Sequence, residues 1–459
     1  MINTVDVATS FIEAACVPLD SGHGSGTLER AQSILAEHPE VAATSIYAAS
    51  LLGDDATVRR FLDRDPAGAT AKGGPRGWDA LIYLCFSRFL RLDRARSSGF
   101  VRTATALLDA GASANTGWYE RNHQPTAEWE SAIYGAAGVA HHADLTRLLL
   151  ERGADPNDEE TPYHAPETWD NAALKVLVES GKLTEDSLTT ILLRKTDWHD
   201  YEGIKWLLER GVDPNRASRW GKTALHNAVL SDNRIEIIQV LLDHGADPTL
   251  VANRPDRSPS ASPGKSAIAI AARRGRGDIL DLFEKRGIPI VLDGVERLIA
   301  ACARNDAPGI RSMVSDEPRL VRELQSEGGK LLAQFAGVGN SNGVSQLLDL
   351  GVNVGALFKE GDGYFDVAPN SMAIHVAAWR ANHGTVKLLL ERGAPVDVPD
   401  GKGRTPLALA VKACVDSYWT DRRSPESVEA LLRAGARASE VRLPSGYSEV
   451  DELLRSYQS

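Results

Sequence analysis

The chain is 459 residues long, is 43% hydrophobic and 25% charged, and carries a formal net charge of −11 at pH 7. This charge argues against nucleic-acid binding, because such proteins normally need a basic surface that displaces counterions. The apolar runs are far shorter than the ~18 residues of a membrane-spanning helix. The N-terminal sequence MINTVDVATSFIEAAC lacks the basic and apolar regions of a secretory signal. We therefore expect a cytoplasmic protein without a nucleic-acid or membrane partner.

Short helices follow one another from the N-terminus. The stretches DVATSFIEAACV and TLERAQSILAEHP predict two helices, separated by the glycine-rich LDSGHGSG, and form an atypical capping repeat within residues 1–44. A first repeat block is predicted over residues 45–250, where long loops such as TGWYERNHQPTAEW and TDWHDYE interrupt the helices. Insertions on a repeat scaffold usually collect where binding happens, so these loops are candidates for a functional surface.

The stretch from Gly221 to Thr249, GKTALHNAVLSDNRIEIIQVLLDHGADPT, predicts a helix pair most clearly. Thr223 is placed to cap the first helix with its hydroxyl, and Asn233 with a glutamate three residues on resembles a capping box for the second helix. Gly245 supplies the left-handed residue that ends the second helix, and a proline follows it. A pair this short cannot bury its own apolar faces and needs neighbours of the same kind.

The ending and the beginning of this pair recur along the chain. The ending recurs as LLDAGASAN, LLLERGADPN, LLERGVDPN, LLDLGVNV, LLLERGAPVD and LLRAGARAS, and the beginning as GKSAIAIAARRG, SMAIHVAAW and GRTPLALAV. On these residues the chain resembles the ankyrin-repeat family, whose turn–helix–helix repeat has about 33 residues. The resemblance implies an all-α ankyrin-repeat solenoid of about twelve divergent, bacterial-type repeats with long hairpin and inter-helix insertions.

The array continues in the second half of the chain. Residues 251–264 include NRPDRSPSASPG and predict a Pro/Ser-rich loop. A second repeat block is predicted over residues 265–439, and GYSEVDELLRSY predicts a C-terminal capping helix within residues 440–459. All parts together form a single predicted solenoid over residues 1–459.

The cysteines and two histidines are assigned to the scaffold. The four cysteines match no zinc spacing, so we expect buried free thiols in a reducing compartment. They are Cys16, Cys85, Cys302 and Cys414. The resemblance implies a structural role for His226 and His375, because the histidine of the family's T-P-L-H start hydrogen-bonds the backbone between neighbouring repeats. Neither residue type shows a metal-binding spacing, and no cofactor is expected.

Aromatic and ionisable residues of the insertions are the candidate partner-binding residues. They fall into two clusters, residues 117–220 and 364–423. Residues that precede the inner helix of a repeat are expected in the concave groove, namely Trp118, Trp129, Tyr163, His164, Trp169, Trp220 and Tyr364. Residues between the two helices are expected at an edge, namely Trp198, His199, Asp200, Tyr201, Tyr418 and Trp419. The remaining candidates are Tyr119, His123, Arg219 and Trp379.

Acid–base groups are present in the first cluster, but no catalytic motif contains them. His123, His199, Asp197, Asp200, Glu202, Glu128 and Glu130 supply ionisable side chains, and carboxylates beside aromatic rings resemble carbohydrate sites. The sequence contains no nucleophile elbow, phosphate-cradling glycine loop or metal motif. We therefore assign no catalytic and no metal-binding residue.

These observations favour a non-catalytic, monomeric scaffold that binds a protein or peptide on an aromatic-rich concave surface. The alternative is binding of a small molecule or carbohydrate, with or without hydrolysis, in a pocket built by the loops of residues 117–220. A peptide groove should be open and continuous along several repeats. A small-molecule site should be an enclosed pocket with convergent polar groups.

Overall fold

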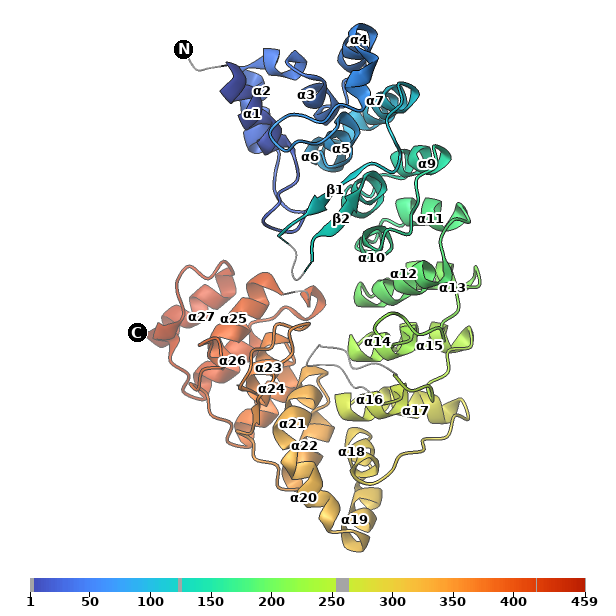
Figure 1. Cartoon of the computed structure of the whole chain (residues 1–459). Coiled ribbons are helices and arrows are strands. Elements are labelled where there is room, and N and C mark those ends of the chain that lie inside the picture. The colour runs from blue at the N-terminus through green and yellow to red at the C-terminus, as the bar shows by residue number, and fades with distance from the viewer. Residues whose placement is uncertain (1–3, 123–125, 253–263, 418, 459) are drawn as a thin grey trace. The chain divides into compact units, whose positions relative to one another are not determined.

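The computed structural model describes residues 4–122, 126–252, 264–417 and 419–458. Two compact units divide the chain, an N-terminal unit of residues 1–213 and a C-terminal unit of residues 214–459. The division between them falls inside the predicted first repeat block. Each unit is a succession of short helix pairs, and the first helix of a pair is called its inner helix (Figure 1). Among the described residues, no helix has both the length and the apolar character that crossing a membrane requires.

The N-terminal unit is built from helix pairs in which inner helices contact inner helices and outer helices contact outer ones. The pairs are α1 (Thr4–Ala15) with α2 (Glu29–Glu37), α3 (Ile46–Leu51) with α4 (Asp55–Arg64), α5 (Ala80–Cys85) with α7 (Ser97–Asp109), α8 (Ala132–Tyr134) with α9 (Ala143–Glu151), α10 (Glu160–His164) with α11 (Ala172–Glu179), and α12 (Glu185–Asp197) with α13 (Tyr201–Leu208). Helix α6 (Arg88–Leu92) lies between α5 and α7, and a π-helical turn at Gly135–Val139 extends α8.

Burial explains the sequence of these helices. An inner helix is covered on several sides, so it is apolar all round, and every residue of α5 is buried. An outer helix buries a single stripe, as in α9, where the buried residues are Leu145, Thr146, Leu149 and Leu150. A continuous hydrophobic core extends from Phe11 to Leu177. The apolar spacing therefore determines which face of each helix joins the stack.

A β-hairpin precedes α8. Strand β1 (Gly117–Glu120) pairs antiparallel with β2 (Glu128–Ser131), with Gly117 opposite Ser131 and Glu120 opposite Glu128. The chain passes from β2 directly into α8, where the Ser131 hydroxyl accepts a hydrogen bond from the Tyr134 N–H at 3.0 Å. This N-cap fixes the start of the helix.

The C-terminal unit continues with the same kind of helix pair. The pairs are α14 (Ala224–Leu230) with α15 (Ile235–Asp243), α16 (Ala267–Arg274) with α17 (Gly277–Lys285), α18 (Val295–Ala303) with α19 (Ala307–Asp316), α21 (Gly328–Gly337) with α22 (Ser341–Asp349), α23 (Ala373–Trp379) with α24 (His383–Glu391), and α25 (Pro406–Asp416) with α26 (Glu426–Arg433). Helix α20 (Arg319–Ser326) lies between α19 and α21, strands β3 (Leu357–Phe358) and β4 (Ser371–Met372) pair before α23, and α27 (Ser448–Gln458) is the last helix.

Most of the local predictions for Gly221–Thr249 are confirmed. Thr223 caps α14 through its side chain, and Gly245 has a positive φ of 86° after α15. The predicted capping box at Asn233 is wrong. The chain turns at Asp232 with a φ of 54°, so α15 begins one residue later, after Arg234, which makes no side-chain cap.

The residues assigned to the scaffold behave as predicted. The Nε2 atom of His226 lies 2.9 Å from the Leu250 carbonyl oxygen, and that of His375 lies 2.8 Å from the Val398 carbonyl oxygen. Both rings therefore tie a helix start to a later backbone segment. All four cysteines are free and buried, and burial raises the pKa of each thiol. Buried protonated thiols are poor nucleophiles.

Candidate functional site on the β1–β2 hairpin

The two faces of the β1–β2 hairpin differ in chemistry. Side chains alternate along a strand, and residues paired across the hairpin share a face. The register therefore places Trp118 and three glutamates on one face, and Tyr119 with Trp129 on the other. Glu120 and Glu130 are only 2% and 0% exposed, whereas Tyr119 is 62% exposed. The carboxylates thus face inward together with Trp118, whereas Tyr119 and Trp129 face outward, and buried carboxylates beside an exposed tyrosine are the reverse of the usual arrangement.

Tyr119 and Trp129 form an aromatic ridge on the outward face. Their ring centroids lie 4.9 Å apart with the planes at 62°, an edge-on contact. Cross-strand aromatic pairs of this kind stabilise a hairpin. Gly117 leaves room for the indole, since a Cβ atom at Gly117 would lie 2.5 Å from the Trp129 ring. The ridge is a surface-exposed aromatic feature on a structured element.

Trp118 anchors the inward face to the core. Its ring centroid lies 4.7 Å from that of Trp78 and 5.9 Å from that of Phe86, which belong to the preceding repeat. The half-buried indole packs against the hydrophobic core. The predicted groove position of Trp118 is therefore wrong, because the strand register directs its ring inward.

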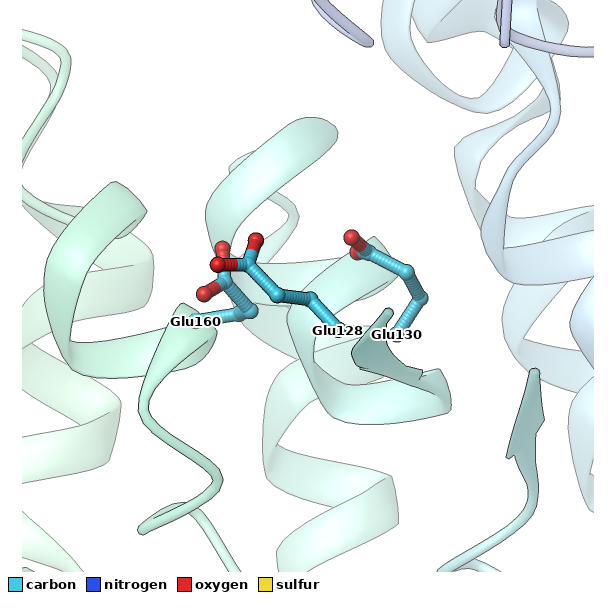
Figure 2. Close-up of side chains that lie close together, drawn as sticks. All are labelled: Glu128, Glu130 and Glu160. Atoms are coloured by element: carbon cyan, nitrogen blue, oxygen red, sulfur yellow. The ribbon is translucent and has the colours of Figure 1, made fainter. Parts of the chain in front are cut away.

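Three carboxylates meet on the inward side. Glu128 and Glu130 of β2 and Glu160 of α10 each offer an oxygen within 4.8 Å of the others. Figure 2 shows the Glu128 carboxylate directed toward that of Glu160, with Glu130 beside them. Glu120 lies close by, since one imidazole ring is near both Glu120 and Glu130. The Nε2 atom of His23 is 3.9 Å from Glu120 Oε2, and its Nδ1 atom is 3.9 Å from Glu130 Oε2. We call Glu120, Glu128, Glu130 and Glu160 the acidic cluster.

The acidic cluster has unusual electrostatics. Burial, reinforced by the negative charge of Glu160, raises the pKa of Glu130 to about 9. Both Glu130 carboxylate oxygens are buried without a hydrogen-bond partner in the described part of the chain. His164 lies 3.2 Å from Glu160 and 2.9 Å from Glu167. Burial opposes the charged imidazolium, but hydrogen bonds to both glutamates outweigh it and raise the pKa of His164 to about 9.

Tyr163 and His164 lie within α10 rather than before it. The Arg194 guanidinium stacks over the Tyr163 ring at 4.1 Å, and the His164 ring lies 5.3 Å from that of Tyr134. Both predicted groove residues are half-buried parts of the inner-helix layer. His164 nevertheless adjoins the acidic cluster through Glu160.

A second aromatic pair, with one exposed ring and one half-buried ring, lies at the other end of the inner helices. Trp169 is 69% exposed, and its ring centroid lies 5.1 Å from that of Trp198 in an edge-on contact. Trp169 follows α10 and Trp198 follows α12, whereas the hairpin precedes α8. The predicted position of Trp169 before an inner helix is therefore wrong, because α10 begins as early as Glu160 and residues 165–171 form the turn after it.

In the turn at residues 198–201, Asp200 holds the local structure together. Asp200 is buried, accepts a hydrogen bond from the Gly203 N–H at 2.9 Å and pairs with Lys195 at 2.8 Å. These contacts cap α13 and leave Asp200 no free surface. His199 adopts a positive φ of 51°, and Tyr201 begins α13 half-buried.

The candidates of the C-terminal unit are dispersed. Arg219 lies over the Trp220 ring at 4.6 Å, Tyr364 is exposed beside Phe365, and Arg380 lies over the half-buried Trp419 at 4.5 Å. Trp379 is 4% exposed and donates its indole N–H to the Phe365 carbonyl oxygen at 2.7 Å, so its predicted surface role is wrong. His123 and Tyr418 lie outside the described residues.

Two cavities open in the C-terminal unit. Their volumes are about 430 and 330 Å³. The larger is lined by residues that include Asn382, His383 and Arg422, and the smaller by residues that include Trp379 and Lys412. Neither includes a residue of 117–213, and the small-molecule pocket expected from the loops of residues 117–220 stays a prediction.

Sequence reasoning missed Glu120, Glu160 and His23 as members of a site. The sequence indicates Glu128 and Glu130 only as possible acid–base groups. The available signal was the alternation W-x-E in β1 and E-x-E in β2, which places carboxylates on the face of Trp118 once the two strands pair. The contribution of Glu160 depends on how α10 packs and leaves no such signal.

Comparison with known proteins shows what family this chain resembles. A family model described as ankyrin repeats (3 copies) matches residues 192–294, and a single ankyrin-repeat model matches residues 371–401. Cyclin-dependent kinase 4 inhibitor B of Bos taurus is 35% identical over 112 residues, which are 23% of this chain and 83% of that protein. The chain belongs to the ankyrin-repeat family. The predicted all-α ankyrin-repeat fold is thereby confirmed.

The chain spans about a quarter of the length of a second curated relative that it matches. Transient receptor potential cation channel subfamily A member 1 of Homo sapiens is 25% identical over 291 residues, 59% of this chain and 24% of the channel. The crystal structure of the human ASB11 ankyrin repeat domain is 21% identical, covers 60% of this chain and 97% of its own, and has a TM-score of 0.25. Ankyrin repeats are generally protein–protein interaction modules.

Proposed function

We propose that this ankyrin-repeat chain is a non-catalytic interaction protein that binds a segment of a partner protein through the aromatic ridge, Tyr119 and Trp129. The observation that carries the proposal is the outward exposure of Tyr119 in edge-on contact with Trp129. Tyrosine and tryptophan are enriched at binding hot spots, where they bury a large area and lose few degrees of freedom. The ridge supplies such anchors on the predicted ligand-facing side of a repeat.

The hairpin holds the ridge in place. Trp118 fixes its inward face to the core, and Asn122 donates a side-chain hydrogen bond to the Leu19 carbonyl oxygen at 2.8 Å. The hairpin is therefore attached both to the preceding repeat and to the glycine-rich insertion of the first one. A surface that is already ordered loses little entropy on binding, which favours affinity.

Charge and exposure indicate the chemistry of the partner. The net charge of −11 favours a neutral or basic segment that presents an apolar side chain to the ridge. Trp169 and Trp198 offer a second contact on the other edge of the inner helices.

The proposal includes a monomeric, cytoplasmic protein without a nucleic-acid or membrane partner. The free buried thiols support a reducing compartment.

Site-specific photo-crosslinking tests the proposal. The photoreactive amino acid p-benzoylphenylalanine replaces Tyr119 in one sample and the exposed Tyr457 of α27 in a control, and adducts from a lysate of the source cell are identified by mass spectrometry. We expect one protein that is enriched at Tyr119 and absent at Tyr457. The purified partner should then lose affinity about tenfold or more for Tyr119→Ala. Equal adducts at both positions, or equal affinities, would overturn the proposal.

The same variants distinguish the carbohydrate alternative. If the ridge binds a sugar, the wild-type chain should bind a glycan panel and Tyr119→Ala should not. The Tyr457→Ala variant removes another exposed aromatic residue and should bind in either case. Retention of glycan binding by wild type, together with no protein adduct at Tyr119, would replace protein recognition by sugar recognition.

A further inference from the structure

The acidic cluster is unusual because most of its carboxylates are buried. It gathers carboxylates from β1, β2 and α10, and Glu120, Glu130 and Glu160 are buried. Exposed acidic groups gather commonly, but buried carboxylates are normally paired or coordinate a metal ion. The cluster lies on the inward face of the hairpin, so it is separate from the aromatic ridge and from the proposed partner binding.

The Glu130 carboxylate provides an independent indication of a missing ligand. Both of its oxygens are buried without a hydrogen-bond partner in the described part of the chain, and so is Glu120 Oε2. Leaving a buried polar group unpaired costs about 1–3 kcal/mol, and more when the group is charged. Figure 2 shows the Glu130 carboxylate next to those of Glu128 and Glu160. A cation between them would satisfy these oxygens.

Most of the described titratable groups around Glu130 carry negative charge. Glu120, Glu128 and Glu160 face it with the same sign of charge. His23 lies 3.9 Å from Glu130, beyond hydrogen-bonding distance, and equally far from Glu120. His164 is already held between Glu160 and Glu167. Among the described residues, His23 and His164 each lie within 4 Å of a carboxylate of the acidic cluster.

We propose that Glu128, Glu130 and Glu160 bind a calcium ion that joins the hairpin to α10. The ligand atoms are all carboxylate oxygens, which suit hard cations, whereas zinc prefers nitrogen and sulfur ligands. Oxygens on opposite sides of a calcium ion lie about 4.6–5.2 Å apart, because each Ca–O distance is about 2.3–2.6 Å. Three carboxylate oxygens within 4.8 Å of one another are therefore close enough for one calcium ion to contact all of them. Magnesium usually binds through one or two carboxylates and keeps several waters, so three protein carboxylates favour calcium.

Isothermal titration of the full-length, EDTA-treated protein with calcium chloride tests the proposal. We expect one calcium ion per chain, a higher melting temperature with calcium, and weaker binding of magnesium. Glu130→Gln keeps the shape of the side chain and removes a charged ligand, so calcium affinity should fall about tenfold or more, equivalent to about 1.4 kcal/mol. Glu151→Gln, at an exposed position at the end of α9, is the matched control and should bind as wild type does.

Terbium luminescence provides a readout at the site itself. Terbium replaces calcium at oxygen sites and is excited by nearby indoles, so its emission should appear in wild type and fall in Glu130→Gln and Glu160→Gln. Absence of calcium heat and of a melting shift in wild type would overturn the proposal. Unchanged affinity in Glu130→Gln, or tighter binding of magnesium or zinc than of calcium, would do so as well. None of these outcomes depends on partner binding, which Tyr119→Ala tests separately.

Discussion

Glu120 and Glu128 lie directly opposite each other across the β1–β2 hairpin. Like charges in this register destabilise a hairpin, so other contacts must hold the strands in place. A slip of one residue would turn the carboxylates outward and the Tyr119–Trp129 pair inward. The packing of Trp118 against Trp78 opposes that slip. The inward carboxylates are therefore a consequence of burying one tryptophan and pairing two other aromatic rings.

Replacing Glu130 by glutamine should change how stability depends on pH. The folded-state pKa of Glu130, about 9, lies above its ordinary value of 4.5. The contribution of its bound proton to stability is complete below pH 4.5 and is lost as the pH rises to about 9. Glutamine carries no titrating proton, so the stability advantage of Glu130→Gln over wild type should grow by about 1.4 kcal/mol per pH unit between about pH 5 and pH 8.

Urea unfolding in EDTA at several pH values measures this difference. The exposed Glu151→Gln variant should follow the wild-type pH dependence throughout. If the free energy of unfolding of wild type and of Glu130→Gln changed with pH in the same way, Glu130 would titrate normally. The buried environment described for Glu130 would then be wrong.

Gly117→Ala should disturb the aromatic ridge while the Tyr119 and Trp129 side chains themselves stay unchanged. The new Cβ atom would lie 2.5 Å from the Trp129 ring and 2.7 Å from the Glu130 carbonyl oxygen. Overpacking of this kind costs about 1–3 kcal/mol, and the displaced indole should weaken partner binding. Gly24→Ala is the control, because nothing lies within 4 Å of the added atom. Equal melting temperatures for the two variants would contradict the hairpin geometry.

The repeat organisation can be predicted from the sequence, because each repeat satisfies the same local requirements for forming and ending its helices. Apolar spacing, a hydroxyl cap such as Thr223 and a glycine with positive φ such as Gly245 all act within one repeat. The scaffold roles of His226 and His375 follow from their position in that pattern. The pattern misplaces helix boundaries where the chain departs from it, as at Trp169, since α10 is short and begins early.

Site residues depend on contacts between repeats, which periodicity does not encode. Trp118 turns inward because Trp78 and Phe86 of another repeat receive it. Glu130 meets Glu160 because α10 packs on the helix that follows the hairpin. Residue type alone makes Tyr119 and Trp379 equal candidates, and their different burial follows only from the packing.

Trp379→Phe should affect stability and leave partner binding unchanged. The indole N–H donates to the Phe365 carbonyl oxygen at 2.7 Å, and the ring is buried. Phenylalanine keeps most of the apolar contact but leaves that carbonyl without this donor, which should cost about 1–2 kcal/mol. Thermal unfolding measures the loss, and the Tyr119 photo-crosslink measures binding. Loss of the crosslink with unchanged stability would restore Trp379 as a binding residue.

Asp232→Asn should strongly destabilise the C-terminal unit. Asp232, in the turn before α15, pairs with Arg274 of α16 and with Arg380, 148 residues further along the chain. All three side chains are buried, and both guanidinium groups stack on Phe365, at 4.9 and 4.1 Å. Removing the charge leaves the two arginines without this counter-ion, which should cost about 3–5 kcal/mol.

The pH dependence of the same variant distinguishes lost charge from lost packing. Burial alone would raise the pKa of Asp232, but Arg274 and Arg380 outweigh it and lower the pKa to about 2. This contribution to stability is complete above the ordinary value of 3.8 and is lost as the pH falls toward 2. The difference in the free energy of unfolding between wild type and Asp232→Asn should therefore become smaller as the pH is lowered toward 2.

Asp366→Asn is the control for a surface ion pair. It removes a more exposed partner of Lys402 and Arg404 and should cost less than about 1 kcal/mol. An equal cost for both variants would mean that the buried pairs contribute no more than surface ones.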